Sequence, residues 1–198
     1  VLLVNPASSI GSVKDLIALA KTKPGQLNYA SAGAGTPPHL SMELFKAMAG
    51  INLVHVPYKG GPLALIDLMG GRVQAMFINI LTALPYVTSG KLMALAVTTP
   101  RRSSVLPQVP TLAEAGNLPG FEANDWFGIL VPAGTPKSAV MRLNREIAYI
   151  LSMPEIRQRL ANQGAEPQSN SPEEFTAFVK VEIAKWKKVI EAAGARVD

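Results

Sequence analysis

Cysteine is absent from the 198 residues of this chain, and only two histidines are present. Without cysteine the chain has no disulfide framework, no thiolate nucleophile and no cysteine-based zinc site, and its redox compartment stays open. Its apolar runs are far shorter than the roughly 18 consecutive residues that a membrane-spanning helix needs. The first residues have neither a basic leader nor a small-residue cleavage site. Any chemistry must therefore come from other side chains or from the backbone.

Acidic residues are also few, with 14 Asp and Glu against 19 Lys and Arg, which gives a formal net charge of +5. Such an excess can steer a small anion, but it is too dispersed to indicate a polyphosphate, so we expect no nucleic-acid partner. Hydrophobic residues make up 48% of the chain, which excludes disorder. A chain of this length can bury one sizeable core or two small ones.

Motifs of common enzyme classes are missing as well. There is no Gly-x-Ser-x-Gly elbow, no His-Glu-x-x-His helix and no acidic pair with the spacing of a hydrolase. The two histidines, His39 and His55, lack the spacing and the carboxylate cluster of a metal site, and His55 is interpreted as a core or strand-end residue. We therefore predict no catalytic residue, no metal site and no cofactor.

What the sequence does contain is an alternation of apolar strands and amphipathic helices over short loops. An opening strand precedes a helix capped by Ser12, and further strands are predicted at 27–30, 53–56, 75–80 and 92–97, with helices at 38–49, 63–69 and 83–89. This alternation is typical of an α/β fold with a mostly parallel sheet flanked by helices.

The composition changes after residue 98, and a domain boundary is predicted near residues 117–123. Beyond it we predict strands at 126–131 and 165–168 and three helices that end near residues 151, 163 and 193. About 70 helix-rich residues rarely enclose a core by themselves. We therefore expect this segment to depend on a sheet from elsewhere, with Trp126 and Phe127 at a cleft between lobes.

The sharpest local feature is the glycine loop at residues 31–38, Ser-Ala-Gly-Ala-Gly-Thr-Pro-Pro, between a strand and a helix start. Ligands of such sheets bind at the carboxyl ends of strands, and helix starts offer amides to anions. Pro38 occupies the third glycine position of a dinucleotide fingerprint, and no lysine follows as in a P-loop. Because Pro37 and Pro38 lack amide protons, few donors remain. They are the amides of Gly35, Thr36 and His39, the Thr36 hydroxyl and Ser31, and they suit one carboxylate. A capped helix start without a ligand fits the loop equally well.

Several motifs in one order connect these features. They are 27–36 with His39-Leu40, 54–60, 90–92 with 95–98, 109–111, 119–122, 126–128, 132–136 and 164–167. Together they resemble the Bug family, the extracytoplasmic solute receptors of tripartite tricarboxylate transporters, over essentially the whole chain.

The resemblance implies a periplasmic binding protein type II-like α/β fold, in which two lobes close on a small organic carboxylate. It implies a periplasmic receptor rather than an enzyme, with the membrane components of a tripartite transporter as partners. Residues 3–123 would form the second, ligand-binding lobe, and residues 124–198 the C-terminal portion of the first lobe. The ligand-binding residues would be Ser31, Gly33, Gly35, Thr36, His39, Tyr58, Asn79 and Trp126.

Two departures from the family pattern carry expectations of their own. Ile78 stands before Asn79 where family members often have an acidic residue, which favours a plain carboxylate over a ligand with an ammonium group. The family's opening strand, Pro-Gly-Gly loop and helix do not precede Val1. We therefore expect an incomplete first lobe that exposes apolar surface and self-associates.

Two other interpretations remain. An α/β enzyme, such as a transferase, would use the loop at 31–36 for a phosphate, and an interaction domain would dock a partner on the basic final helix. The prolines of the loop argue against the first, and no feature favours the second.

Overall fold

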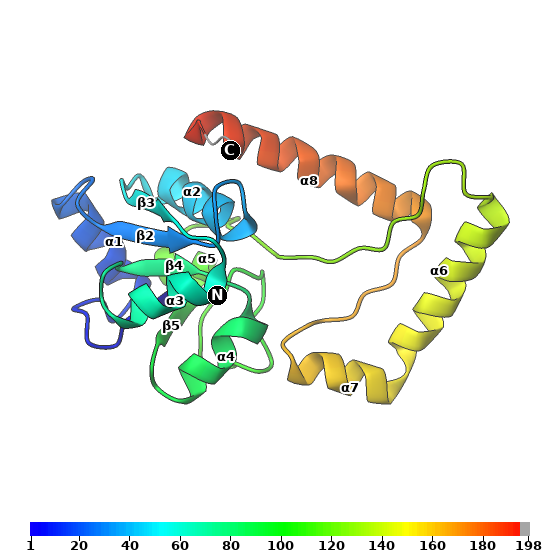
Figure 1. The fold of residues 1–198 in the computed structure, drawn as a ribbon, viewed down its shortest axis with the longest axis horizontal. Helices are drawn as coiled ribbons and strands as arrows, with labels where there is room; N and C mark the ends of the chain where they lie inside the picture. Colours follow the sequence, from blue (N-terminus) through cyan, green and yellow to red (C-terminus); the bar gives the residue numbers. More distant parts are fainter. Residues whose placement is uncertain (195–198) are drawn as a thin grey trace. The chain divides into compact units, whose positions relative to one another are not determined.

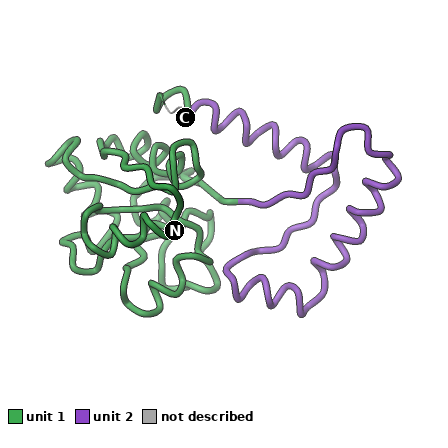
Figure 2. The backbone as a smooth tube through the Cα atoms, in the orientation of Figure 1, with its two compact units in different colours: residues 1–125, 189–198 green, residues 126–188 purple. Residues whose placement is uncertain are grey.

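The computed structural model describes residues 1–194, and the predicted C-terminal segment ends in residues 195–198, which lie outside the described residues. The chain divides into two compact units (Figure 2). Unit 1 comprises residues 1–125 and the chain from residue 189, and unit 2 comprises residues 126–188. That these parts correspond to two lobes of a receptor stays a proposal.

Unit 1 alternates strands with helices, as predicted from the sequence (Figure 1). In chain order its elements are β1 (Leu2–Val4), α1 (Val13–Thr22), β2 (Asn28–Ser31), α2 (Pro37–Ala49), β3 (Val54–Pro57), α3 (Gly61–Met69), β4 (Ala75–Phe77), α4 (Ile80–Thr88), β5 (Met93–Ala96) and α5 (Leu112–Gly116). Local signals explain several boundaries. Ser12 caps α1, and Thr111 and Glu114 form the expected capping box of α5.

The five strands form one sheet in the order β3-β2-β4-β1-β5. β2 pairs in parallel with both β3 and β4, whereas β1 is antiparallel to both β4 and β5. Four strands therefore run in one direction, which confirms a mostly parallel α/β sheet with β1 as the exception.

The core of unit 1 lies around β1, whose three residues are all buried. An uninterrupted apolar run of this kind is typical of a strand that is covered on both faces. Phe45 of α2 is fully buried and meets Phe77 and Phe121 edge-to-face, with ring centroids 6.2 and 6.4 Å apart. Unit 1 thus has the buried apolar interior of a folded domain.

Unit 2 is built from α6 (Lys137–Ser152), α7 (Pro154–Asn162) and most of α8 (Pro172–Ala193). None of these helices contains a buried residue. The strands predicted at 126–131 and 165–168 were wrong, because both segments are irregular here. A strand needs a partner for its backbone groups, and the sheet of the described residues contains no strand from unit 2.

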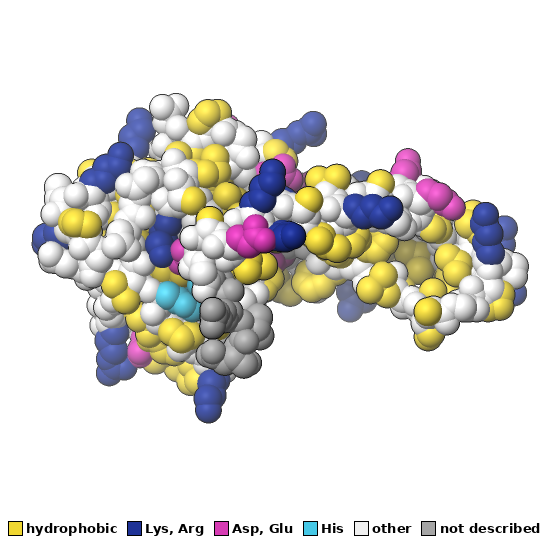
Figure 3. Space-filling view, turned by 90° about the horizontal axis from the view of Figure 1, so that it is seen from above, with side chains coloured by type: hydrophobic (Ala, Val, Ile, Leu, Met, Phe, Trp, Pro, Cys, Tyr) yellow, Lys and Arg dark blue, Asp and Glu magenta, His cyan; other side chains and the backbone are white. Residues whose placement is uncertain are grey.

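Apolar side chains of unit 2 remain largely in contact with solvent (Figure 3). Phe127 is 95% exposed and Leu130 is 83% exposed, as expected for a segment that encloses no core. One packing contact in unit 2 is aromatic: the Trp126 ring lies edge-on to Phe175 and Phe178, with centroids 5.7 and 5.2 Å away. Within residues 1–194, no helix combines the length and apolar character needed to cross a membrane.

Candidate functional site

Three strand ends and three helix starts meet at one edge of the unit 1 sheet (Figure 1). Because β2 is parallel to β3 and β4, the carboxyl ends of these strands share that edge, and α2, α3 and α4 begin a few residues later. The connecting segments are 32–36, 58–60 and 78–79. We call these segments and the adjoining helix starts the carboxyl edge. It is the position at which open α/β sheets bind ligands.

The glycine loop folds back on itself at this edge. Gly33 and Gly35 have φ angles of 140° and 72°, which side-chain-bearing residues rarely adopt. The buried Ser31 hydroxyl accepts a hydrogen bond from the Gly33 amide at 3.1 Å, and the Thr36 hydroxyl donates to the Gly33 carbonyl oxygen at 2.7 Å. The loop is therefore shaped by its own polar groups.

These internal bonds reduce the set of donors that faces outward. The Gly35 amide donates to Nδ1 of His39 at 3.0 Å, and the Thr36 amide approaches the Gly33 carbonyl oxygen at 3.4 Å. Pro37 and Pro38 occupy the first turn of α2. Within residues 1–194 no acceptor is bound to the amides of Ala34 and His39. Ligand contacts from Ser31, Gly33, Gly35 and Thr36 stay predictions.

The loop after β3 is fastened to the glycine loop. The Tyr58 amide donates to the Ser31 carbonyl oxygen and the Gly60 amide to the Ala32 carbonyl oxygen, both at 3.1 Å. Lys59 between them is exposed and adds a positive charge to the carboxyl edge. The two loops therefore form one hydrogen-bonded unit.

Two further predicted ligand residues also belong to this edge. Tyr58 donates its hydroxyl hydrogen to Asp67 of α3 at 2.7 Å, and Arg72 binds the other carboxylate oxygen at 2.7 Å. The hydrogen bond from Tyr58 and, to a smaller extent, the bond from Arg72 lower the pKa of Asp67. Desolvation and the bond to Asp67 raise the pKa of Tyr58. Asn79 is exposed and caps α4, because its Oδ1 accepts from the Thr82 amide at 2.9 Å. Its side-chain NH2 group is left for other partners.

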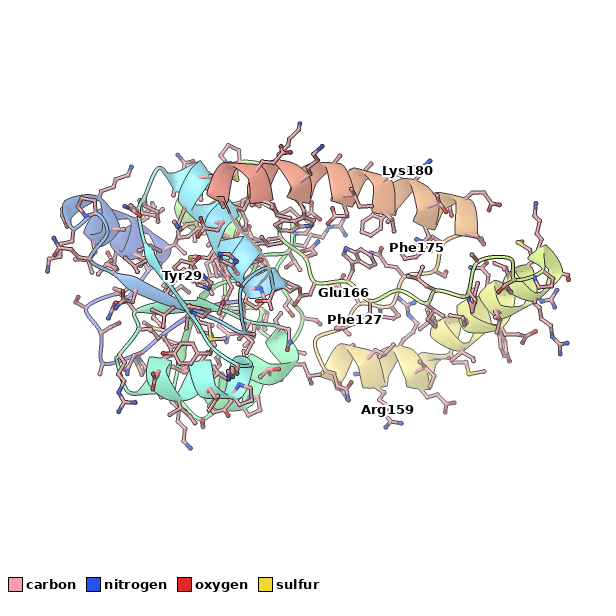
Figure 4. All side chains as sticks on the ribbon, turned by 45° about the horizontal axis from the view of Figure 1, so that its top comes forward. Tyr29, Phe127, Arg159, Glu166, Phe175 and Lys180 are labelled. Atoms are coloured by element: carbon pink, nitrogen blue, oxygen red, sulfur yellow. The ribbon has the colours of Figure 1, made fainter. Side chains whose placement is uncertain are left out.

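Sequence reasoning missed the role of His55. Its Nε2 lies 2.6 Å from the Ser31 hydroxyl oxygen, and its ring stacks against both Tyr29 (labelled in Figure 4) and His39, at centroid distances of 4.9 and 4.0 Å. The parallel register pairs Tyr29 with His55 and places both beneath Ser31 on one face, a pairing that no local sequence signal gives. Burial, and then the neighbouring His39, lower the pKa of His55 to about 4.

The structure thus gathers most of the predicted site residues in unit 1. At the carboxyl edge lie Ser31, Gly33, Gly35, Thr36, His39, Tyr58 and Asn79. Trp126 belongs to the aromatic contacts of unit 2 instead. The residue before Asn79 is Ile78, which has no carboxylate and is buried. Residues 1–194 contain no cluster of three or more His, Asp or Glu side chains that is suited to a metal ion.

Similarity to known proteins shows the family to which the chain belongs. Residues 1–195 match the tripartite tricarboxylate transporter family receptor. The chain belongs to this family. Among curated relatives, Protein BugT of Bordetella pertussis is 37% identical over 197 residues, covering 100% of this chain and 60% of its own length. A UPF0065 protein of a Pseudomonas species, from the tcbD-tcbE intergenic region, is 39% identical over 190 residues, covering 96% of this chain and 56% of its own length.

Solved structures of receptors in this family share the fold. R. palustris Rpa4515 with adipate is 40% identical with a TM-score of 0.89, and the match covers 100% of this chain and 66% of that one. MatC of Rhodopseudomonas palustris with bound malate is 31% identical with a TM-score of 0.81, covering 96% of this chain and 65% of that one. The periplasmic binding protein BugD is 32% identical with a TM-score of 0.83, covering 100% and 66%.

The chain spans little more than half the length of the curated relatives above, 56% and 60%. The periplasmic binding protein fold predicted from the sequence is confirmed, as one part of such a receptor.

Proposed function

We propose that this chain forms the ligand-binding part of a periplasmic solute receptor that captures a small organic carboxylate for a tripartite transporter. The observation that carries the proposal is the carboxyl edge, where the starts of α2, α3 and α4 converge beside a polar glycine loop. Backbone amides and the positive ends of helix dipoles favour an anion there. The adipate and malate bound by the similar receptors are both organic carboxylates.

The donors at this edge favour a single carboxylate group over a phosphate. On the glycine loop and the first turn of α2, the amides of Ala34 and His39 are open and prolines remove further donors, while Asn79 offers its side-chain NH2 group. A tightly bound phosphate needs a nest of consecutive amides around several oxygens. This arrangement argues against the transferase alternative, which would place a phosphate in the loop at 31–36.

The buried Ile78 adds a second restriction on the ligand. Its side chain packs against the start of α3, because a Cβ added at Gly61 would lie 3.0 Å from Ile78 Cδ1. A ligand ammonium group placed there would meet a methyl group where it needs a carboxylate. We therefore infer a ligand with acidic groups and no amine.

The binding experiment uses the 198-residue chain and isothermal titration with adipate, malate, glutamate and inorganic phosphate. We expect heat of binding with adipate or malate and none with phosphate. Glutamate separates a plain carboxylate site from an amino acid site. Phosphate binding without any response to the dicarboxylates would instead support the transferase interpretation.

The periplasmic location and the transporter partners are tested in cells. A tagged receptor should appear in the periplasmic fraction, and deletion of the membrane components of the tripartite transporter should abolish uptake of the bound carboxylate. Retention in the cytoplasmic fraction would contradict the proposed location.

A further inference from the structure

His39 stands out because it is buried in the first turn of α2 yet is bonded to the glycine loop. Its exposed fraction is 6%, and its ring lies parallel to that of His55, with an interplanar angle of 6°. The two imidazole rings are in contact and form a titratable group beside the glycine loop. Nothing in the proposed carboxylate contacts explains why imidazoles are needed there.

The hydrogen bond from the loop defines the state of His39. The Gly35 amide donates to Nδ1 at 3.0 Å, so Nδ1 must carry a lone pair and the proton must sit on Nε2. A protonated imidazole has hydrogen on both nitrogens and has no acceptor to offer. Protonation of His39 would therefore set two donors against each other and break the bond that holds Gly35.

The second histidine holds the other end of the same loop. His55 Nε2 contacts the Ser31 hydroxyl oxygen, which also accepts the Gly33 amide. The stacked pair thus supports the loop at two points, Ser31 and Gly35. Two imidazolium rings with centroids 4.0 Å apart would repel each other, so the pair favours the neutral state.

The charged groups around the pair, Glu43 and Lys46, come from α2, and β2 adds the titratable hydroxyl of Tyr29. Glu43 Oε1 lies 3.9 Å from His39 Nε2, but it is already bound by Lys46 at 2.7 Å and by the Tyr29 hydroxyl. Burial lowers the pKa of His39, and Glu43 raises it less than burial lowers it. The imidazole of His39 is thus neutral near neutral pH and becomes protonated in acid.

We propose that His39 is a positioning residue for the carboxylate site: its neutral Nδ1 holds Gly35, and protonation releases the glycine loop and weakens ligand binding. This inference rests on the proposed function for its effect on binding, but the bond itself is testable without any ligand. It assigns to the receptor a loss of affinity in acid that originates in the protein and not in the ligand.

The first test follows the loop directly by NMR on the 198-residue chain. The Gly35 amide and the His39 ring nitrogens are recorded while the pH is lowered from about 7.5 to about 4, a range that spans histidine titration. We expect the Gly35 amide to shift with the same midpoint as Nδ1 of His39. A Gly35 resonance that stays fixed while His39 titrates would overturn the proposal.

Two variants separate a titrating acceptor from a merely structural side chain. His39→Asn places a non-titrating oxygen near the Nδ1 position, and His39→Leu removes the acceptor at every pH. We expect the Leu variant to lose adipate affinity about threefold to tenfold near pH 7.5, the value of one ordinary hydrogen bond, and the Asn variant to recover part of that loss. Circular dichroism confirms that both variants fold.

The deciding quantity is the ratio of adipate affinities of wild type and His39→Asn at each pH, since protonation of adipate itself cancels in that ratio. We expect this ratio to fall about threefold to tenfold between neutral pH and acid. A ratio that rises in acid would mean that charged His39 attracts the ligand and would overturn the proposal. If neither protein binds adipate at neutral pH, the proposed function fails, and the NMR titration still decides the role of His39.

Discussion

Unit 1 and unit 2 come from one chain but bury their apolar residues to very different extents. Every residue of β1 is buried in unit 1, whereas α6 and α7 of unit 2 bury none. The difference follows from the sheet: five paired strands give unit 1 two faces against which helices pack, and unit 2 contributes no strand to it. Amphipathic helices are stabilised mainly by the surface on which they pack, so helix pattern alone does not make a core.

Two phenylalanines, one in each unit, give the sharpest test of this comparison. Phe45→Ala removes a fully buried ring and should lower the free energy of unfolding by about 3–5 kcal/mol. Phe127→Ala changes a ring that is 95% exposed and should alter it by less than about 0.5 kcal/mol. Urea unfolding followed by circular dichroism measures both. A loss above about 2 kcal/mol for Phe127→Ala would show that unit 2 has a core of its own in solution.

A second pair tests whether the carboxyl edge is the binding site. Gly33 has a φ of 140° inside the glycine loop, and Gly50 has a φ of 62° at the far end of α2. Alanine is strained at both positions, but only Gly33→Ala distorts the loop of the proposed site. We expect Gly33→Ala to weaken adipate binding at least about tenfold and Gly50→Ala to leave it within about twofold, measured by titration calorimetry. Equal effects of the two changes would remove the glycine loop from the site.

The two units also differ in how well their sequence predicted them. Local signals predicted the elements of unit 1, and these elements were found. The signals are the glycine loop, the caps at Ser12 and Thr111 and the apolar runs of the strands. The predicted strand at 75–80 was too long, because Asn79 caps α4 and ends the strand at Phe77. Local chemistry therefore predicted most of the elements of unit 1.

The sequence did not predict how separate elements pair and pack against one another. The antiparallel direction of β1 and the pairing of Tyr29 with His55 depend on which strands become neighbours. The number of backbone amides free to bind a ligand was overestimated for the same reason. The Gly35 amide donates to the ring of His39, and the position of that ring is not evident from the sequence. The apolar run at 126–131 has strand composition, but composition does not provide a pairing partner.

The exposed apolar surface of unit 2 leads to a third prediction, which is self-association. We expect the 198-residue chain to show concentration-dependent sedimentation, because Phe127, Leu130 and Val181 are 95%, 83% and 65% exposed. Replacing Phe127 and Leu130 together by serine should shift the protein toward the monomer without changing the unfolding of unit 1. A wild-type chain that sediments as a monomer at every concentration would contradict this expectation.

The smallest effect is expected at Tyr58, where the two roles considered for this residue give different results. Its hydroxyl bonds Asp67 of α3 at 2.7 Å, so Tyr58→Phe should cost about 0.5–1.5 kcal/mol of stability, the value of one hydrogen bond. Adipate affinity should change by less than about twofold, because the backbone of residue 58, which is tied to Ser31, is retained. Asp67→Asn is the matched control, since it weakens the same bond from the other side. A tenfold loss of affinity in Tyr58→Phe but not in Asp67→Asn would assign the Tyr58 hydroxyl to the ligand, and would mean that it leaves Asp67 when the carboxylate binds.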